Sequence, residues 1–252
     1  MSTAGRGLRG PHTLVFSDVD ETLITCKSLF DFLVYYRQQR YGPTATAGAT
    51  ALRAELAARA AAGEPRELLN RAYFRAWQGE LVSEVTAWGR RWFAERAREG
   101  GFFRTETLAA LRCHLADGAA VVLVSGSLPA VLEPIAEAIG AAEVVCARPA
   151  AHCGRFTGEL LGPPMIGTAK REAVRAVLDR YPQVAVADCY GYGDHVTDLP
   201  MLTEVGHPVV VGGSPELLRL LPRRCRVSRL LCPEHERELV VGQLPGMVLY
   251  GC

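Results

Sequence analysis

The chain has 252 residues, of which 49% are hydrophobic, and its formal net charge is +1. This composition is typical of a soluble globular protein with one sizeable core, or a core with a smaller partner domain. The near-zero charge gives no overall attraction to nucleic acid or to an acidic membrane, and no apolar run reaches the roughly 20 residues of a membrane helix. We expect a cytoplasmic protein, without nucleic-acid or membrane partners, whose eight cysteines are reduced thiols.

The predicted elements of the first half are one strand followed by helices. Residues 1–12 contain basic residues without a hydrophobic stretch behind them, so we expect a disordered tail and not a secretory signal. The apolar run at 12–17, HTLVFS, predicts a buried strand that ends at Asp18. From 28 to about 105, helical spacing predicts helices near 30–36 and over 46–62, 67–77 and 83–98, with aromatic residues packed in their core.

The second half alternates helices and strands. The pattern predicts helices at 105–115, 130–139 and 168–181, a small hairpin at 154–161, and strands at 119–124, 143–146, 184–192 and 207–211. Such alternation indicates a parallel sheet with helices on both faces. The expected fold is α/β: a Rossmann-like core with a five-stranded parallel sheet, formed by 13–27 and 106–252, with an inserted α-helical domain at 28–105. Residues after about 222 receive no assignment.

Polar residues gather at the carboxyl ends of the predicted strands, where open α/β sheets bind ligands. They are Asp18, Asp20 and Thr22 after the first strand, Ser125 and Gly126 after the second, Lys170 at a helix start, and Asp194 and Asp198 after the fourth strand. Carboxylates this close repel unless a cation lies among them, and an all-oxygen site favours Mg²⁺. Mg²⁺, a lysine and backbone N–H groups together suit a phosphate dianion. One of Asp18 and Asp20 can attack phosphorus while the other handles the proton of the leaving alcohol.

Taken in order, these motifs resemble those of the haloacid dehalogenase superfamily over about residues 13–212. The matching segments are DVDET from Asp18, Ser125 after VVLV, Lys170, and YGDHVTDLPML around Asp194. The helical insertion directly after the first motif resembles the helical cap of the phosphoserine-phosphatase-like branch, as do the segments SLFDFLVYY, GRFTGEL and VGHPVVV.

The resemblance implies a role for each residue. Asp18 is the nucleophile and a Mg²⁺ ligand, and Asp20 is general acid and then base, with its backbone carbonyl on the metal. Phosphate is bound by Thr22, Ser125, Gly126 and Lys170, whereas Asp194 ligates Mg²⁺ and Asp198 supports the metal site. The implied reaction is Mg²⁺-dependent hydrolysis of a small phosphate monoester through an aspartyl-phosphate.

Lys27 departs from the pattern, because phosphoserine phosphatases have a glutamate there that binds the substrate amine. A cation at this place repels an α-ammonium group, which argues against phosphoserine. Lys27 either contacts a carboxylate, a second phosphate or a polyol, or is a solvated lysine at the edge of the helical domain. Further specificity candidates in the same segment are Cys26, Ser28 and Phe30.

Other interpretations remain open at this stage. They are a phosphotransferase that uses an acceptor alcohol, phosphoserine phosphatase itself, and a non-catalytic binding module, against which the undamaged motifs argue. We interpret His195 as a passive loop residue, because the site favours hard oxygen ligands. The grouping of Cys225, Cys232 and His235 lacks a fourth zinc ligand and is read as coincidence. The sequence does not give the oligomeric state.

Overall fold

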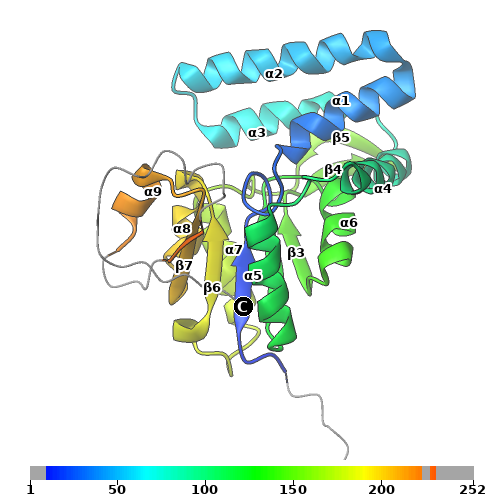
Figure 1. Cartoon of the computed structure of the whole chain (residues 1–252). Helices are drawn as coiled ribbons and strands as arrows, with labels where there is room; N and C mark the ends of the chain where they lie inside the picture. Colours follow the sequence, from blue (N-terminus) through cyan, green and yellow to red (C-terminus); the bar gives the residue numbers. More distant parts are fainter. Residues whose placement is uncertain (1–9, 223–227, 231–252) are drawn as a thin grey trace, which may run out of the picture.

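The computed structural model describes residues 10–222 and 228–230. It consists of an α/β core with a block of helices over one end of its sheet (Figure 1). The predicted tail before residue 10 and the grouping of Cys225, Cys232 and His235 lie outside the described residues. Among the residues that are described, no helix is both long and apolar enough to cross a membrane.

The core is a parallel sheet of six strands in the order β3-β2-β1-β6-β7-β8. The strands are β1 (Leu14–Ser17), β2 (Ala120–Ser125), β3 (Glu143–Cys146), β6 (Tyr190–Gly193), β7 (His207–Val211) and β8 (Ser228–Leu230). Ser17 pairs with Leu123 of β2 and Tyr192 of β6, so these three strands end at one edge. The predicted parallel Rossmann-like sheet is confirmed, with β8 as a sixth strand in the stretch that received no assignment.

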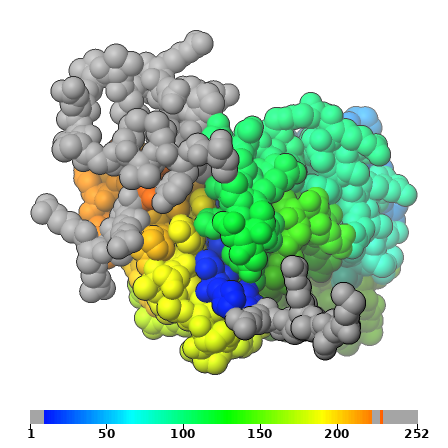
Figure 2. All heavy atoms as spheres, turned by 60° about the horizontal axis from the view of Figure 1, so that its bottom comes forward, coloured from blue at the N-terminus to red at the C-terminus, as the bar shows by residue number. Residues whose placement is uncertain are grey.

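Side chains of β1 alternate between two apolar layers, which is why the whole strand is hydrophobic. Val15 packs in the layer that includes helix α6 (Pro129–Ile139), while Leu14 and Phe16 pack on the other side with helix α7 (Thr168–Leu178). All three side chains are fully buried. The remaining core helices are α5 (Thr105–Ala116), η4 (Val196–Asp198), α8 (Leu199–Leu202) and α9 (Pro215–Leu220). Figure 2 shows the end of the molecule opposite the helical block, where the blue residues leading into β1 reach the surface.

Two predicted elements differ from the structure. The strand expected at 184–192 begins only at Tyr190, because residues 186–188 form a 3-10 helix, η3, closed by hydrogen bonds such as Cys189 N to Val186 O at 3.1 Å. The segment expected to form a whole hairpin, residues 154–161, contains only the second strand of one. That strand, β5 (Arg155–Leu160), pairs with β4 (Pro149–His152) through a turn in which Cys153 and Gly154 both have positive φ, the conformation favoured in two-residue hairpin loops.

The helical block comprises residues 28–99. Its elements are α1 (Ser28–Tyr41), η1 (Pro43–Ala45), α2 (Thr46–Ala61), α3 (Arg66–Phe74), η2 (Arg75–Trp77) and α4 (Val82–Glu99). Its centre is aromatic, as predicted: the rings of Phe32 and Trp77 stack at 5.3 Å, and Trp92 meets Phe32 edge-on at 5.9 Å. Each of these side chains is fully or almost fully buried, so the aromatic stripe is packing.

Among the contacts that attach the helical block to the rest of the chain, two bring backbone segments close together. Residues 79–82 lie along β5, with Gly79 N donating to Phe156 O at 2.8 Å and Phe156 N donating to Glu80 O at 2.9 Å. Helix α4 crosses α6 so closely that a Cβ atom at Gly89 would lie 2.0 Å from Ala130 O. The domain borders predicted from the sequence stay a prediction, since the hairpin of β4 and β5 packs with the helical block although it follows β3 in the chain.

Candidate active site

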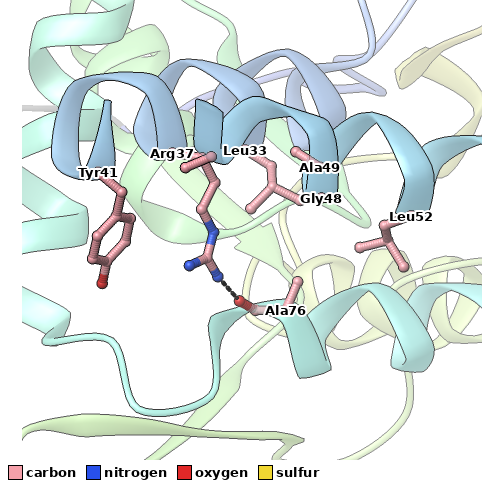
Figure 3. Close-up of a pocket in the computed structure, with 8 residues that line it drawn as sticks. Leu33, Arg37, Tyr41, Gly48, Ala49, Leu52 and Ala76 are labelled. Atoms are coloured by element: carbon pink, nitrogen blue, oxygen red, sulfur yellow. Dashed lines mark hydrogen bonds between the residues drawn. The ribbon is translucent and has the colours of Figure 1, made fainter. Parts of the chain in front are cut away.

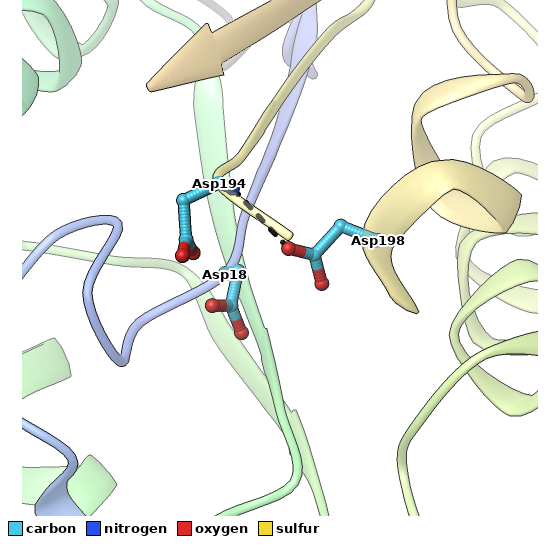
Figure 4. Close-up of side chains that lie close together, drawn as sticks. All are labelled: Asp18, Asp194 and Asp198. Atoms are coloured by element: carbon cyan, nitrogen blue, oxygen red, sulfur yellow. Dashed lines mark hydrogen bonds between the residues drawn. The ribbon is translucent and has the colours of Figure 1, made fainter. Parts of the chain in front are cut away.

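Three aspartates meet at the edge of the sheet where β1 and β6 end (Figure 4). Asp18 directly follows β1, and its backbone N–H donates to Tyr192 O of β6 at 3.0 Å. Asp194 follows β6, and Asp198 ends the short helix η4. In the described part of the chain, these three side chains form a group that could hold a metal ion, because each offers one carboxylate oxygen and these oxygens all lie within 4.8 Å of one another.

Lys170 lies between two of these carboxylates. Its Nζ donates to Asp18 Oδ1 at 2.6 Å and to Asp198 Oδ1 at 2.7 Å, and only 3% of the residue is exposed. Burial alone disfavours the ammonium, but the two carboxylates more than offset this effect and raise the pKa of Lys170. Lysine therefore supplies a permanent positive charge on the floor of the site.

One lysine does not neutralise the cluster. Burial, together with the negative charges of Asp198 and Asp194, raises the pKa of Asp18 well above its usual value, although Lys170 acts in the opposite direction. Burial also raises the pKa of Asp194 to about 6. Ionised carboxylates at this spacing need a further cation, and an all-oxygen donor set fits a hard divalent ion such as Mg²⁺. The residues present therefore fit the expected metal.

Thr22 and Asp198 orient the cluster. The Thr22 hydroxyl, fully buried, donates to Asp194 Oδ1 at 2.6 Å, and Thr22 does not line the pocket described below. Its donor is thus used on a carboxylate, which differs from the predicted contact with phosphate. Asp198 Oδ2 accepts from the backbone N–H of His195 at 3.1 Å, and a Cβ at Gly193 would lie 2.7 Å from Asp198 Cβ. Gly193, directly before Asp194, must therefore be a glycine to allow this close approach.

Asp20 is buried beside the cluster. Burial raises its pKa to about 6, while hydrogen bonds from the hydroxyl and backbone N–H of Ser28 act to lower it. In the part of the chain that the structure describes, the other oxygen, Asp20 Oδ1, is buried without a hydrogen-bond partner. Ser28 Oγ lies 2.7 Å from Ser127 Oγ, and Ser127 N donates to Ser125 Oγ at 3.2 Å. A chain of polar contacts therefore links the Asp20 loop to the loop after β2.

The specificity candidates fall into two groups. Lys27 and Phe30 line the pocket, whereas Cys26 and Ser28 do not. Ser28 is fully buried, and it contributes to the site through its hydrogen bonds to Asp20. Cys26 packs against the apolar core, and burial raises the pKa of its thiol to about 12. Lys27 is half-exposed, and its Nζ lies 3.2 Å from Glu21 Oε2.

A pocket of about 360 Å³ opens above the cluster, between the core and helices α1, α2 and α3. Its far wall combines apolar side chains with cations. The apolar members are Leu29, Phe30, Leu56, Ala57, Ala60, Leu69 and Tyr73, and the cations are Lys27, Arg53 and Arg66. His195 also lines this pocket; its Nδ1 accepts from Thr197 N at 3.1 Å, so it is held by its own loop.

A second cavity of about 290 Å³ lies within the helical block (Figure 3). Arg37 extends into it and donates to Ala76 O, and its Nη1 also pairs with the buried Glu80 at 3.0 Å. The other lining residues are Leu33, Tyr41, Ala45, Gly48, Ala49 and Leu52, mostly apolar. With its charged group already paired and no acidic cluster in its lining, this cavity is not the candidate active site.

Comparison with known proteins places the acidic cluster in a family. The profile of the haloacid dehalogenase-like hydrolases matches residues 15–203, a range that includes Asp18, Lys170, Asp194 and Asp198. The chain belongs to this family. The resemblance predicted from the motifs of this hydrolase is therefore confirmed.

Curated relatives of this chain include proteins of Mycobacterium tuberculosis and Streptomyces azureus. The chain is 39% identical over 103 residues to a probable phosphatase of Mycobacterium tuberculosis, a match that covers 40% of this chain and 34% of the relative. The chain thus spans about a third of the length of that relative. A match of 31% identity over 218 residues covers 83% of the chain and 75% of the Streptomyces azureus protein named inhibition of morphological differentiation protein.

Solved structures share the fold of the hydrolase. A Bordetella pertussis protein of unknown function superposes with a TM-score of 0.73 at 25% identity, over 86% of this chain and 98% of the other. A phosphoserine phosphatase solved as a phospho-aspartyl intermediate analogue has a TM-score of 0.64 at 16% identity, over 90% and 97% of the two chains. At that identity the likeness concerns the fold alone.

Sequence reasoning missed the pocket residues contributed by α2 and α3. Arg53, Arg66 and Asn70 line the pocket, yet no motif marks them. Asn70 is the chain's single asparagine, and it occupies the buried face of an amphipathic helix. A polar residue on an otherwise apolar helical stripe is the one signal that sequence offered.

Proposed function

We propose that this hydrolase is a Mg²⁺-dependent phosphatase that cleaves a small phosphate monoester, with Asp18 as the nucleophile. The observation that carries the proposal is Lys170 Nζ, buried and bonded to both Asp18 and Asp198 beside a cluster of oxygen ligands. A phosphoryl group brings negative charge to a site that already has a fixed ammonium and room for a metal ion among carboxylates. The relative named as a probable phosphatase supports this activity.

The metal would be held by Asp18, Asp194 and the backbone carbonyl of Asp20, with Asp198 supporting the site. When bound, Mg²⁺ neutralises charge on the carboxylates and on the transferring phosphoryl group. Thr22 keeps Asp194 in place through the 2.6 Å hydrogen bond. Ser125 and the backbone N–H of Gly126, at the end of β2, would bind phosphoryl oxygens.

The chain's own groups carry the two chemical steps. In the first, an Asp18 carboxylate oxygen bonds to phosphorus as the bond to the leaving oxygen breaks, and Asp20 gives its proton to that oxygen. In the second, Asp20 takes a proton from water, which attacks phosphorus and releases Asp18. A carboxyl with a pKa of about 6 can both donate and accept protons near neutral pH.

The helical block is proposed to act as a cap that limits substrate size. Helices α1, α2 and α3 form the far wall of the 360 Å³ pocket, which leaves room for a small metabolite and not for a protein segment. Helices over the pocket would also limit the access of bulk water to the phosphoryl group. We propose a cytoplasmic phosphorylated metabolite as the substrate.

The test is hydrolysis of p-nitrophenyl phosphate with and without Mg²⁺. We expect turnover that EDTA abolishes, and a loss of at least about a thousandfold in Asp18→Asn, which removes the nucleophile. Asp188→Asn is the matched control, because Asp188 is exposed and does not line the pocket. Full activity in Asp18→Asn, or turnover that ignores EDTA, would reject the proposal. Added acceptor alcohols would reveal any phosphotransfer as a phosphorylated product.

A further inference from the structure

Asn70 connects the helical block to the loop that follows β2. It lies on α3, is 93% buried, and lines the pocket above the acidic cluster. Its Nδ2 donates to Gly126 O at 3.1 Å. A backbone carbonyl can only accept a hydrogen bond, so the NH₂ group must face Gly126. The orientation of the carboxamide is fixed by this contact, and the position of Oδ1 follows from it.

Asn70 Oδ1 is buried and has no hydrogen-bond partner in the described part of the chain. Buried acceptors are almost always paired, so each exception needs an explanation. Among the unpartnered buried atoms of the described residues, only two belong to residues that line the pocket: Asp20 Oδ1 and Asn70 Oδ1. The first is explained by the leaving-group oxygen that Asp20 is proposed to protonate. The second requires a donor on the same bound molecule.

We propose that Asn70 Oδ1 accepts a hydrogen bond from a hydroxyl group of the leaving alcohol, so that the substrate is the monophosphate of a polyol. This inference rests on the proposed phosphatase function. The tie to Gly126 places the acceptor beside the backbone that would bind the phosphoryl oxygens. The hydroxyl is therefore expected close to the ester, on the adjacent carbon.

The charges of the pocket favour a hydroxyl over an ammonium as the donor. Lys27, Arg53 and Arg66 line the pocket, and in the described residues neither arginine has an acidic partner within salt-bridge distance. Apart from the four aspartates of the proposed catalytic and metal site, the acid in the lining is Glu21, which already pairs with Lys27 at 3.2 Å. An ammonium group would meet three cations and no free carboxylate on this wall, whereas a neutral hydroxyl carries no such penalty.

Three esters with the same three-carbon chain test the proposal: glycerol 1-phosphate, n-propyl phosphate, which lacks both free hydroxyl groups, and 2-aminopropyl phosphate, which carries only an amine on carbon 2. We expect kcat/KM of the wild-type enzyme to be at least about tenfold higher for glycerol 1-phosphate than for n-propyl phosphate, because the analogue leaves Asn70 Oδ1 unpaired. The amine should not exceed n-propyl phosphate. Equal values for the first two esters, or a preference for the amine, would overturn the proposal even if no variant folded.

Two variants of Asn70 isolate the acceptor. Asn70→Leu and Asn70→Asp both lose the amide donor to Gly126, but only Asn70→Asp keeps an oxygen acceptor. We expect the ratio of kcat/KM for glycerol 1-phosphate over n-propyl phosphate to fall to near one in Asn70→Leu and to persist in Asn70→Asp. An unchanged ratio in a folded Asn70→Leu, checked by circular dichroism, would overturn the proposal.

The two proposals fail in different ways. If the wild-type enzyme hydrolyses p-nitrophenyl phosphate through Asp18 but does not discriminate among the three esters, the polyol inference is wrong and the phosphatase proposal stands. If no phosphate ester is hydrolysed, with or without Mg²⁺, both are wrong.

Discussion

Replacing Thr22 by valine removes one hydroxyl from behind the proposed metal site. The side chain is fully buried, and its Oγ1 donates to Asp194 Oδ1 at 2.6 Å. Valine has nearly the same shape, so the main loss is this hydrogen bond. A hydrogen bond to a charged group contributes about 1.5–3 kcal/mol, and every 1.4 kcal/mol corresponds to about tenfold in an equilibrium constant.

Two effects act on metal binding in Thr22→Val, and they have the same sign. Asp194 loses the partner that orients it, and outer-shell substitutions of this kind cost about 10- to 100-fold in metal affinity. The hydroxyl also lowers the pKa of Asp194, which burial has raised to about 6, so that pKa rises further when the hydroxyl is removed. Mg²⁺ must then displace a proton at neutral pH. We expect the Mg²⁺ concentration for half-maximal activity to rise about 10- to 100-fold.

The assay is p-nitrophenyl phosphate hydrolysis at fixed pH over a wide range of Mg²⁺ concentrations. Thr22→Ser keeps the hydroxyl and should retain the wild-type requirement for Mg²⁺. In Thr22→Val, kcat should recover at saturating Mg²⁺, because the lost interaction concerns the metal ligand. An unchanged Mg²⁺ requirement combined with a raised KM for the ester would refute this reasoning, and it would favour the phosphate contact that the sequence predicts for Thr22.

Three further outcomes are expected. Burial raises the pKa of Asp20 and Asp194 to about 6, so their protonated forms stabilise the metal-free protein at low pH, and that stability is lost as pH rises from about 4 through about 6. The gain in Tm from saturating Mg²⁺ should therefore be larger at pH 7 than at pH 5, and equal gains would contradict this. Gly89→Ala should lower the free energy of unfolding in urea by about 1–3 kcal/mol, since its Cβ would lie 2.0 Å from Ala130 O, whereas Gly48→Ala, in helix α2 with open space around it, should raise it by about 0.5–1 kcal/mol. Lys27→Glu should shift the substrate preference toward amine-bearing esters, measured as the kcat/KM ratio of 2-aminopropyl to n-propyl phosphate, and an unchanged ratio would remove Lys27 as a specificity residue.

The candidate site was largely predictable because its members stand at fixed places relative to strand and helix ends. Asp18 comes directly after a buried apolar strand, and parallel strands end at a common edge, so local patterns suffice to bring Asp18, Ser125 and Asp194 together. The partner of Thr22 could not be predicted in the same way. Asp194 is 172 residues away in the chain, and nothing local indicates whether a buried hydroxyl faces a phosphate or a carboxylate.

The errors in the predicted fold also arise where contacts formed on folding, and not the local sequence pattern, decide the structure. Residues 184–192 are apolar enough for a strand, but Val186 to Asp188 form a 3-10 helix with its own hydrogen bonds. Strand β8 has three residues and lies at the sheet edge next to β7, so its pairing comes from tertiary contact and not from its own sequence pattern. The role of Asn70 depends on a contact between α3 and the loop after β2, which only the folded arrangement of the helical block creates.

The helical block is attached unevenly to the rest of the chain. Helix α4 packs closely against α6 at Gly89, and residues 79–82 are joined to the hairpin of β4 and β5 by backbone hydrogen bonds. Helix α2, in contrast, buries only Ala49 and Leu56 and is flanked by Gly42 and Gly63, both with positive φ. With so few buried side chains, α2 is expected to move at a lower cost than the whole block. A displacement of α2 would widen the pocket while the contact of Asn70 in α3 with the loop after β2 is kept.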